Sequence, residues 1–222
     1  MRLERASAKA VRYAVMNYHY SKAVPMVLVA YAVFNGAGEW CGIIAYSSGA
    51  NSHIATPYGL KQGQVAELVR VALNGKQEST SQALSISLRL LKKECPLVQL
   101  LVSYADPQQQ HVGTIYQATN WIYTGKTVPK AAIIDPHSGK TIHSRSAVAK
   151  YGTTKGLTWA PYECRLKYLY PFNKAAKAIA ETLRKPYPKK PASEAQMDER
   201  PDTIGEAGGS IPTHSLTLTP AT

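Results

Sequence analysis

The spacing of hydrophobic and polar residues predicts a chain of alternating strands and helices. Between residues 5 and 18, apolar residues recur three to five positions apart, as on one face of a helix: Ala6, Ala10, Val11, Ala14 and Val15. Two apolar runs at 27–34 and 40–46 flank the turn sequence NGAG. We expect these two runs to form a β-hairpin, because such a turn suits closely paired antiparallel strands.

The middle of the chain predicts a strand–helix–strand unit. The strands are 65–73 and 98–104, and the second is a near-continuous apolar run, as expected of a strand covered on both faces. Between them, residues 82–94 have a helical pattern, preceded by the candidate N-caps Ser79 and Ser81. The long polar loop at 47–64 precedes this unit, and its length indicates a functional role.

The rest of the chain predicts shorter elements and a tail. We expect helices at 113–120, 144–151 and 175–183, and strands at 121–124, at 162–170 and on both sides of the turn DPHSG. From residue 185 onward Pro, Gly, Ser and Thr dominate without a period, which indicates disorder. The sequence therefore predicts one α/β domain at 1–184, containing an insertion at 126–158, followed by a disordered tail at 185–222. The fold class is a mixed central sheet flanked by helices.

The charge of the chain lies in its folded part. The net charge is +12, from 26 basic and 14 acidic residues. Four basic and five acidic residues lie from Lys185 onward, so the preceding residues hold the whole excess. A compact body this basic attracts polyanions, nucleic acid above all. The alternative is a basic enzyme with an acidic small substrate or an acidic protein partner.

Cysteine usage and apolar runs indicate a cytoplasmic protein. The three cysteines, Cys41, Cys95 and Cys164, show no CxxC or zinc spacing, which fits a reducing compartment. The N-terminus lacks the apolar stretch of a signal peptide, and no run of about 18 apolar residues occurs. We expect no membrane partner.

The insertion is rich in basic residues. Residues 126–155 contain six basic residues and only one acidic residue, Asp135. The basic residues are Lys126, Lys130, Lys140, Arg145, Lys150 and Lys155. We interpret them, together with Lys22, as a surface that contacts DNA phosphates without reading sequence. Ordinary solvated charge is the alternative.

Two loops carry candidate catalytic residues. His19, Tyr20 and Ser21 lie between the first helix and the first strand, and Asp106 follows strand 98–104 directly. The carboxyl end of a buried strand is where α/β sheets place their chemistry. A helix-terminal His with a packing Tyr, and an Asp-Pro turn, are the structural alternatives. On strand 65–73 we expect Glu67 and Arg70 on opposite faces, with Arg70 meeting Asp106, a ligand phosphate or a structural ion-pair partner.

The segment IYQATNWIY, residues 115–123, resembles the "LYxxxGF" segment of the Gcn5-related N-acetyltransferase family. That resemblance implies that strands 65–73 and 98–104 splay apart to admit acetyl-CoA, and that Tyr116 protonates the departing thiolate. A helix Tyr packed on the sheet is the alternative. The pyrophosphate would lie at the N-terminus of helix 82–94, although NGKQESTSQ lacks the family's Q/R-x-x-G-x-G/A loop. The implied cofactor-binding residues are Leu68, Val69, Arg70, Gly75, Ser81 and Gln82.

Four segments together resemble the Mom family of Mu-like phages: 17–25 (NYHYSKAVP), 66–73 (AELVRVAL), 103–126 (SYADPQQQHVGTIYQATNWIYTGK) and 166–172 (LKYLYPF). The resemblance implies carbamoylmethylation of adenine N6 in DNA from an acetyl-CoA-derived unit, which protects phage DNA from restriction in the bacterial cytoplasm. It also implies iron, with His19, Tyr20 and Asp106 as candidate ligands and His111 as another, since two His and one carboxylate suit that metal.

The partners implied are double-stranded DNA and acetyl-CoA, and a homodimer is left open. The adenine would have to be flipped out of the duplex. Two other functions compete: a conventional acetyl-CoA-dependent N-acetyltransferase acting on an amine or a protein, and a non-catalytic DNA-binding protein.

Overall fold

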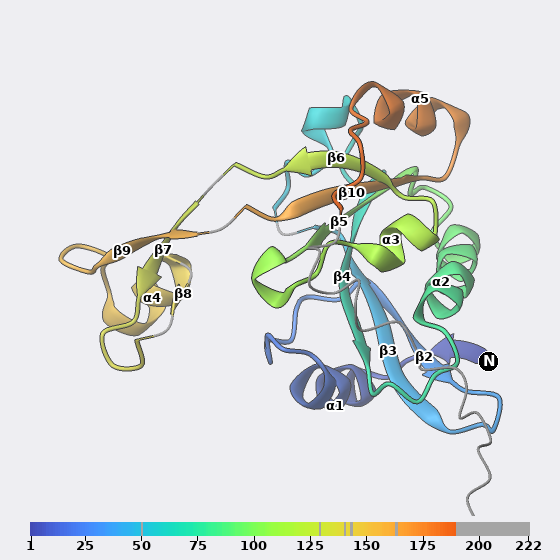
Figure 1. The fold of residues 1–222 in the computed structure, drawn as a ribbon, viewed down its shortest axis with the longest axis horizontal. Coiled ribbons are helices and arrows are strands. Elements are labelled where there is room, and N and C mark those ends of the chain that lie inside the picture. Colours follow the sequence, from blue (N-terminus) through green and yellow to red (C-terminus); the bar gives the residue numbers. More distant parts are fainter. Residues whose placement is uncertain (50, 129, 140, 143, 163, 190–222) are drawn as a thin grey trace, which may run out of the picture. The chain divides into compact units, whose positions relative to one another are not determined.

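The computed structural model describes residues 1–189 apart from 50, 129, 140, 143 and 163, and it shows a mixed α/β fold (Figure 1). The central sheet has seven strands in the order β1-β2-β3-β4-β5-β10-β6. Only β4 and β5 are parallel neighbours. The strands are β1 (Arg2–Arg5), β2 (Val29–Phe34), β3 (Trp40–Ser47), β4 (Val65–Leu73), β5 (Leu100–Ala105), β6 (Ile122–Lys126) and β10 (Leu166–Pro171). This order confirms the predicted mixed central sheet, with strands 65–73 and 100–105 as parallel neighbours.

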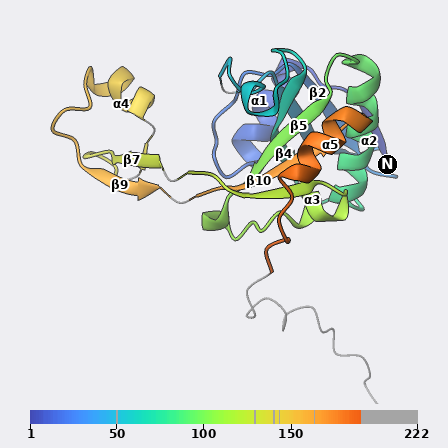
Figure 2. The same cartoon turned by 90° about the horizontal axis from the view of Figure 1, so that it is seen from above.

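Helices cover both faces of the sheet (Figures 1 and 2). One face packs against α1 (Ala8–Tyr18) through Ile43 and Ala45, and against α5 (Lys174–Thr182) through Leu100. The other face packs against α2 (Thr80–Glu94) and α3 (Thr114–Ala118) through residues such as Tyr46 and Leu101. Two short 3-10 helices, η1 (Thr56–Tyr58) and η2 (Pro107–Gln109), interrupt the loops.

The parallel pair β4 and β5 separates after a short stretch. The paired residues run from Val65 opposite Leu100 to Glu67 opposite Val102. A β-bulge lies at the same place on the other side of β4, because Tyr46 pairs with Leu68 and the preceding residue of β3, Ala45, pairs with Arg70. A bulge inserts one unpaired residue, here Val69, and bends the strand. The predicted splay of these two strands is therefore observed.

Several predicted boundaries differ from the structure. The strand β1 was not predicted, because its four residues (RLER) carry no alternating apolar pattern. Ser7 and Ser79 are the N-caps of α1 and α2, and their hydroxyl groups accept hydrogen bonds from the Ala10 and Gln82 amides. The predicted strand at 162–170 is in fact two strands in different sheets, β9 (Trp159–Tyr162) and β10.

The insertion between β6 and β10 forms a second, three-stranded sheet in the order β8-β7-β9. Its elements are β7 (Lys130–Ile134), β8 (Thr141–Ile142), α4 (Ser144–Tyr151) and β9. Ile133 and Ala147 are fully buried within it. The carboxylate of Asp135 accepts hydrogen bonds from Lys150 Nζ at 2.7 Å and Tyr151 Oη at 2.5 Å, so it ties α4 to the strands.

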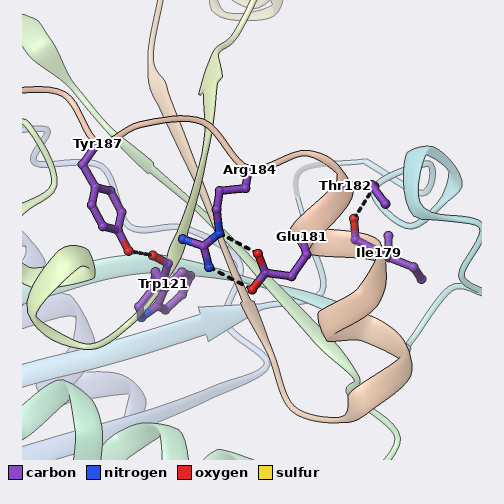
Figure 3. A network of polar contacts seen from close by, with 6 residues as sticks. All are labelled: Trp121, Ile179, Glu181, Thr182, Arg184 and Tyr187. Atoms are coloured by element: carbon purple, nitrogen blue, oxygen red, sulfur yellow. Dashed lines mark hydrogen bonds and ion pairs between the residues drawn. The ribbon is translucent and has the colours of Figure 1, made fainter.

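The first residues after α5 form hydrogen bonds with the start of β6 and with Trp121, the residue before it. Figure 3 shows Arg184 paired with Glu181, and the Tyr187 hydroxyl donating a 2.5 Å hydrogen bond to the Trp121 carbonyl oxygen. The Lys185 amide donates to the Tyr123 carbonyl oxygen at 2.8 Å. The compact unit therefore extends to Pro188, four residues beyond the predicted boundary. Most of the predicted tail, 190–222, lies outside the described residues.

Candidate active site

A pocket of about 420 Å³ opens where β4 and β5 separate. Its wall includes the end of α1, the bulged part of β4, the carboxyl end of β5 and the segment that leads into α3. The residues that line it are Tyr18–Tyr20, Glu67–Val71, Tyr104–Asp106, Gln110–Tyr116 and Arg165. Four of the five predicted catalytic residues, His19, Tyr20, Asp106 and Tyr116, therefore meet in one cavity.

Ser21, the fifth predicted catalytic residue, holds the ring of His19. The Ser21 amide donates a 3.1 Å hydrogen bond to His19 Nδ1, and the Ser21 hydroxyl lies 2.9 Å from the same nitrogen. Because Nδ1 accepts a hydrogen bond, the neutral ring carries its proton on Nε2. Burial, with the charges of Arg70, His111 and Lys22, lowers the His19 pKa to about 4. At neutral pH His19 is therefore an uncharged Nε2–H donor.

Tyr20 joins the two histidines of the pocket. Its ring stacks on His19 with 4.4 Å between ring centroids, and it meets His111 edge-on at 5.9 Å. The side chain is 48% exposed. A half-exposed aromatic ring at the mouth of a pocket offers a flat surface on which a planar ligand can stack.

Tyr116 is a buried polar residue of the pocket. Its hydroxyl lies 2.9 Å from the Ser103 hydroxyl, which is also 2.9 Å from the Leu68 carbonyl oxygen. Ser103 is the donor to both the Tyr116 oxygen and the Leu68 carbonyl oxygen, so its single proton is shared between these two acceptors and the Tyr116 proton stays available to a ligand. Burial raises the pKa of the phenol to about 12, although the Ser103 contact lowers it. Tyr116 is thus a protonated donor at neutral pH.

The prediction that Arg70 and Glu67 lie on opposite faces of β4 is wrong. Arg70 pairs with Ala45, which packs against α1, because the bulge at Val69 shifts the alternation by one residue. The Arg70 guanidinium donates to the Ala23 carbonyl oxygen at 2.9 Å and to the Val69 carbonyl oxygen at 2.7 Å. Its main role here is to anchor the loop that carries His19 to β4.

Two carboxylates line the pocket from different strands. Asp106 follows β5 and is 7% exposed, and its carbonyl oxygen accepts hydrogen bonds from the Gln109 and His111 amides. Glu67 lies on β4 at the last residue pair before the splay. Either carboxylate is a candidate acceptor for a substrate proton.

The predicted iron site does not fit the arrangement of donors. Within residues 1–189 as described, no three His, Cys, Asp or Glu side chains are grouped closely enough to hold one metal ion. Nδ1 of His19 is already engaged by Ser21, and Nε2 carries the proton. A set of two His and one carboxylate needs all three donors aimed at one point. The described side chains therefore do not form the predicted iron site.

The predicted cofactor-binding residues fall into two groups. Leu68, Val69 and Arg70 line the pocket. Gly75, Ser81 and Gln82 do not, since they lie in and before the first turn of α2, where the Ser79 cap accepts from the Gln82 amide.

The predicted DNA-contacting residues are spread over three elements. Lys22 is exposed beside the pocket loop, Lys126 ends β6, and Arg145 and Lys155 are exposed in the insertion. Lys150 is instead paired with Asp135, so its charge is largely neutralised. Lys130 belongs to β7, and Lys140 lies outside the described residues.

Sequence reasoning missed three residues of the site. Ser103 was detectable, because a lone hydroxyl in a strand buried on both faces must have a partner. Gly113 has φ +81° and lies so close to the Tyr168 ring that a Cβ would stand 2.5 Å from it. Arg165 lines the pocket from the residue before β10, and no local pattern signals that position.

The sequence profile of the Mom protein family matches residues 1–189. No curated protein matches the chain. In the described part of the chain, no helix has both the length and the apolar character needed to span a membrane.

Several solved acetyltransferase-type structures are similar at low identity. The Bacillus subtilis acetyltransferase in complex with CoA shares 10% identity, covers 78% of this chain and 99% of its own, and has a TM-score of 0.43. FeeM, an N-acyl amino acid synthase from uncultured soil microbes, shares 16% identity, covers 79% of this chain and 97% of its own, and has a TM-score of 0.44. The spermidine/spermine N-acetyltransferase SpeG from Vibrio cholerae shares 8% identity, covers 82% of this chain and 96% of its own, and has a TM-score of 0.42. Likeness at this level says nothing about activity.

Proposed function

We propose that this chain, which belongs to the Mom protein family, modifies adenine N6 in double-stranded DNA with an acetyl-CoA-derived unit to give a carbamoylmethyl group. In a phage-infected bacterial cytoplasm this modification would protect phage DNA from restriction. The observation that carries the proposal is that three separate segments, 17–25, 66–73 and 103–126, contribute side chains to one pocket.

The acyl-CoA would lie along the opening between β4 and β5. The backbone of Leu68–Arg70 borders the pocket past the last paired residues and would face the pantetheine arm. The N-terminus of the 15-residue helix α2, with Gly75, Ser81 and Gln82, would hold the pyrophosphate, since unpaired amides and the helix dipole favour an anion. When bound, the group would supply the activated two-carbon unit.

Tyr116 would act on the sulfur of the leaving thiolate. A thiol has a pKa near 8.5, whereas the buried Tyr116 phenol has a pKa of about 12. Complete proton transfer from the phenol to the thiolate is therefore uphill. We infer that Tyr116 stabilises the thiolate by donating a hydrogen bond, with its own oxygen oriented by Ser103.

The flipped adenine would be held at the other side of the pocket. Tyr20 offers the stacking surface, and neutral His19 offers an Nε2–H donor for a ring nitrogen of the base. The amino group of adenine is a hydrogen-bond donor, so it would face a carboxylate, Asp106 or Glu67. That carboxylate would accept a hydrogen bond from the N6 amino group and hold it in the pocket.

The DNA backbone would be bound by exposed basic residues. Lys22, Lys126, Arg145 and Lys155 remain candidates, and Lys130 and Lys140 stay predictions from the sequence. Removing one cation that neutralises a phosphate lowers the slope of log affinity against log salt by about 0.9. We expect K126A/K155A to reduce this slope by almost two, whereas K174A/K177A on α5 leaves it unchanged.

Mass spectrometry of nucleosides tests the proposed function. DNA is isolated from cells that express the wild-type chain, D106N, or E181Q as a control on α5. A carbamoylmethyl adduct on adenine with the wild type and E181Q, and its loss with D106N, is the expected result. An N-acetyl adduct would instead indicate conventional acetyl transfer, and no adduct with intact DNA binding would indicate a non-catalytic DNA-binding protein.

A further inference from the structure

The loop between α1 and β2 exposes an unusual number of large apolar side chains beside the pocket. Met26 is 82% exposed, Leu28 48% and Val24 44%. Leu97, between α2 and β5, is exposed to a similar degree, at 76%. Exposed apolar groups gathered on one segment usually mark a surface that is covered in the functional complex.

The loop is held firmly at both ends. Arg70 donates to the Ala23 carbonyl oxygen at 2.9 Å, and the Leu28 amide donates to the Tyr46 carbonyl oxygen at 2.8 Å. Met26 is three positions after Ala23, so their Cα atoms are at most about 11 Å apart. Arg70, which holds Ala23, itself lines the pocket, so the loop is joined directly to a residue of the pocket wall.

The charge of this part of the chain suits a polyanion. No acidic residue occurs between Glu4 and Glu39, whereas Arg5, Lys9, Arg12 and Lys22 all fall in or beside that stretch. Lys9, Arg12 and Lys22 are exposed. An apolar tip flanked by exposed cations is the arrangement that proteins use when they push a side chain between DNA bases and hold the adjacent phosphates.

We propose that Met26, supported by Val24 and Leu28, enters the base stack of duplex DNA and fills the space that the target adenine leaves. The inference rests on the proposed function, because only a base that must leave the duplex creates this space. Flipping a base out of the duplex costs the stacking and pairing interactions of that base. An apolar wedge offsets part of that cost by restoring contact with the neighbouring bases. Met suits the role, because its unbranched side chain adapts to irregular gaps.

Fluorescence of 2-aminopurine, placed at adenine positions of a duplex oligonucleotide, measures the flipping directly. The wild-type chain, M26A and the matched control L97A are compared at saturating protein, with the same oligonucleotide as a single strand in parallel. We expect the rise in duplex fluorescence to be about tenfold smaller with M26A than with the wild type, and unchanged with L97A. Both variants should bind the single strand as the wild type does.

The second readout is the adenine adduct in DNA from cells that express each variant. An adduct level reduced in M26A and normal in L97A supports the wedge. Equal fluorescence and equal adduct levels in M26A and wild type would overturn the wedge while leaving the proposed function intact. Loss of single-strand binding in M26A would overturn it too, because the side chain would then serve general affinity. A wild-type chain that yields no adduct contradicts the proposed function itself.

Discussion

Removing the hydroxyl of Tyr116 separates its chemical role from its packing role. In Y116F the ring still packs against Trp121 and Tyr168, whose centroids lie 5.2 and 4.9 Å away. Only the hydrogen bond to Ser103 disappears, and Ser103 still donates to the Leu68 carbonyl oxygen. In S103A, by contrast, both the Tyr116 hydroxyl and the Leu68 carbonyl lose their partner in a site where Ser103 is 1% exposed.

The two variants therefore differ in which property they damage. One ordinary hydrogen bond contributes about 1 kcal/mol to the free energy of unfolding, so Y116F is expected to be only slightly less stable. A buried polar group left without a partner costs roughly 1–3 kcal/mol, and S103A leaves two, for a decrease of about 2–6 kcal/mol in the free energy of unfolding. For turnover we expect the opposite order, with Y116F losing more activity than S103A. Y116F removes the hydrogen-bond donor to the thiolate and is expected to lose at least about a hundredfold in turnover, as when one donor to a developing anion is removed.

Thermal or urea unfolding and the rate of adduct formation are measured for both variants and for Y123F. Tyr123 is 7% exposed and does not line the pocket, so Y123F controls for loss of a buried phenol. Each kcal/mol should lower the Tm by roughly 2–4 °C in a domain of this size. Near-normal turnover in Y116F, or a turnover decrease no greater than that of Y123F, would refute the role of Tyr116 at the thiolate.

Three further predictions concern the frame of the site. G113A should destabilise the domain by roughly 2–5 kcal/mol, since Gly113 has φ +81° and a Cβ would clash with Tyr168; a Tm equal to that of G139A, which has open space, would contradict this. The His19 pKa is lowered in the folded state, to about 4, so the stability it contributes is present above about pH 6.5 and is lost as the pH falls toward 4. H19Q should reduce this decline in the unfolding free energy, and an unchanged pH profile would show that the ring is not held neutral. D135A should expose α4 to hydrogen exchange while β2–β5 stay protected, because Lys150 and Tyr151 lose their acceptor; equal protection in α4 would show that this contact is dispensable.

Much of the fold follows from local patterns. The spacing of apolar residues predicted α1, the β2–β3 hairpin and the β4–α2–β5 unit, because side-chain periods of two and 3.6 residues identify strands and helices wherever one face is buried. The small sheet of the insertion was predicted in outline from the turn DPHSG and the helix after it. The strand β1 was not, because its stability comes from pairing with β2.

Part of the site was also predictable. The prediction that chemistry lies just past the end of β5 placed Asp106 in the pocket, because the carboxyl end of a buried strand leads into a crevice. Tyr116 entered through the resemblance of its segment to known families. Which groups would meet inside the crevice was beyond local patterns, since these groups come from segments some fifty residues apart.

The sequence by itself determined the order of elements, the basic charge of the folded part and the segments that carry polar chemistry, because these depend on residues near one another in the chain. Tertiary structure alone decided what each group contacts. One bulge residue in β4 moved Arg70 to the face of Glu67 and gave it the Ala23 carbonyl as partner. The Ser21 contact determines which ring nitrogen of His19 carries the proton. Asp135 forms an ion pair with Lys150, one of the residues predicted to contact DNA. The physical reason is that a shift of one residue reverses which face a side chain occupies, and that shift is set by pairing with a distant strand.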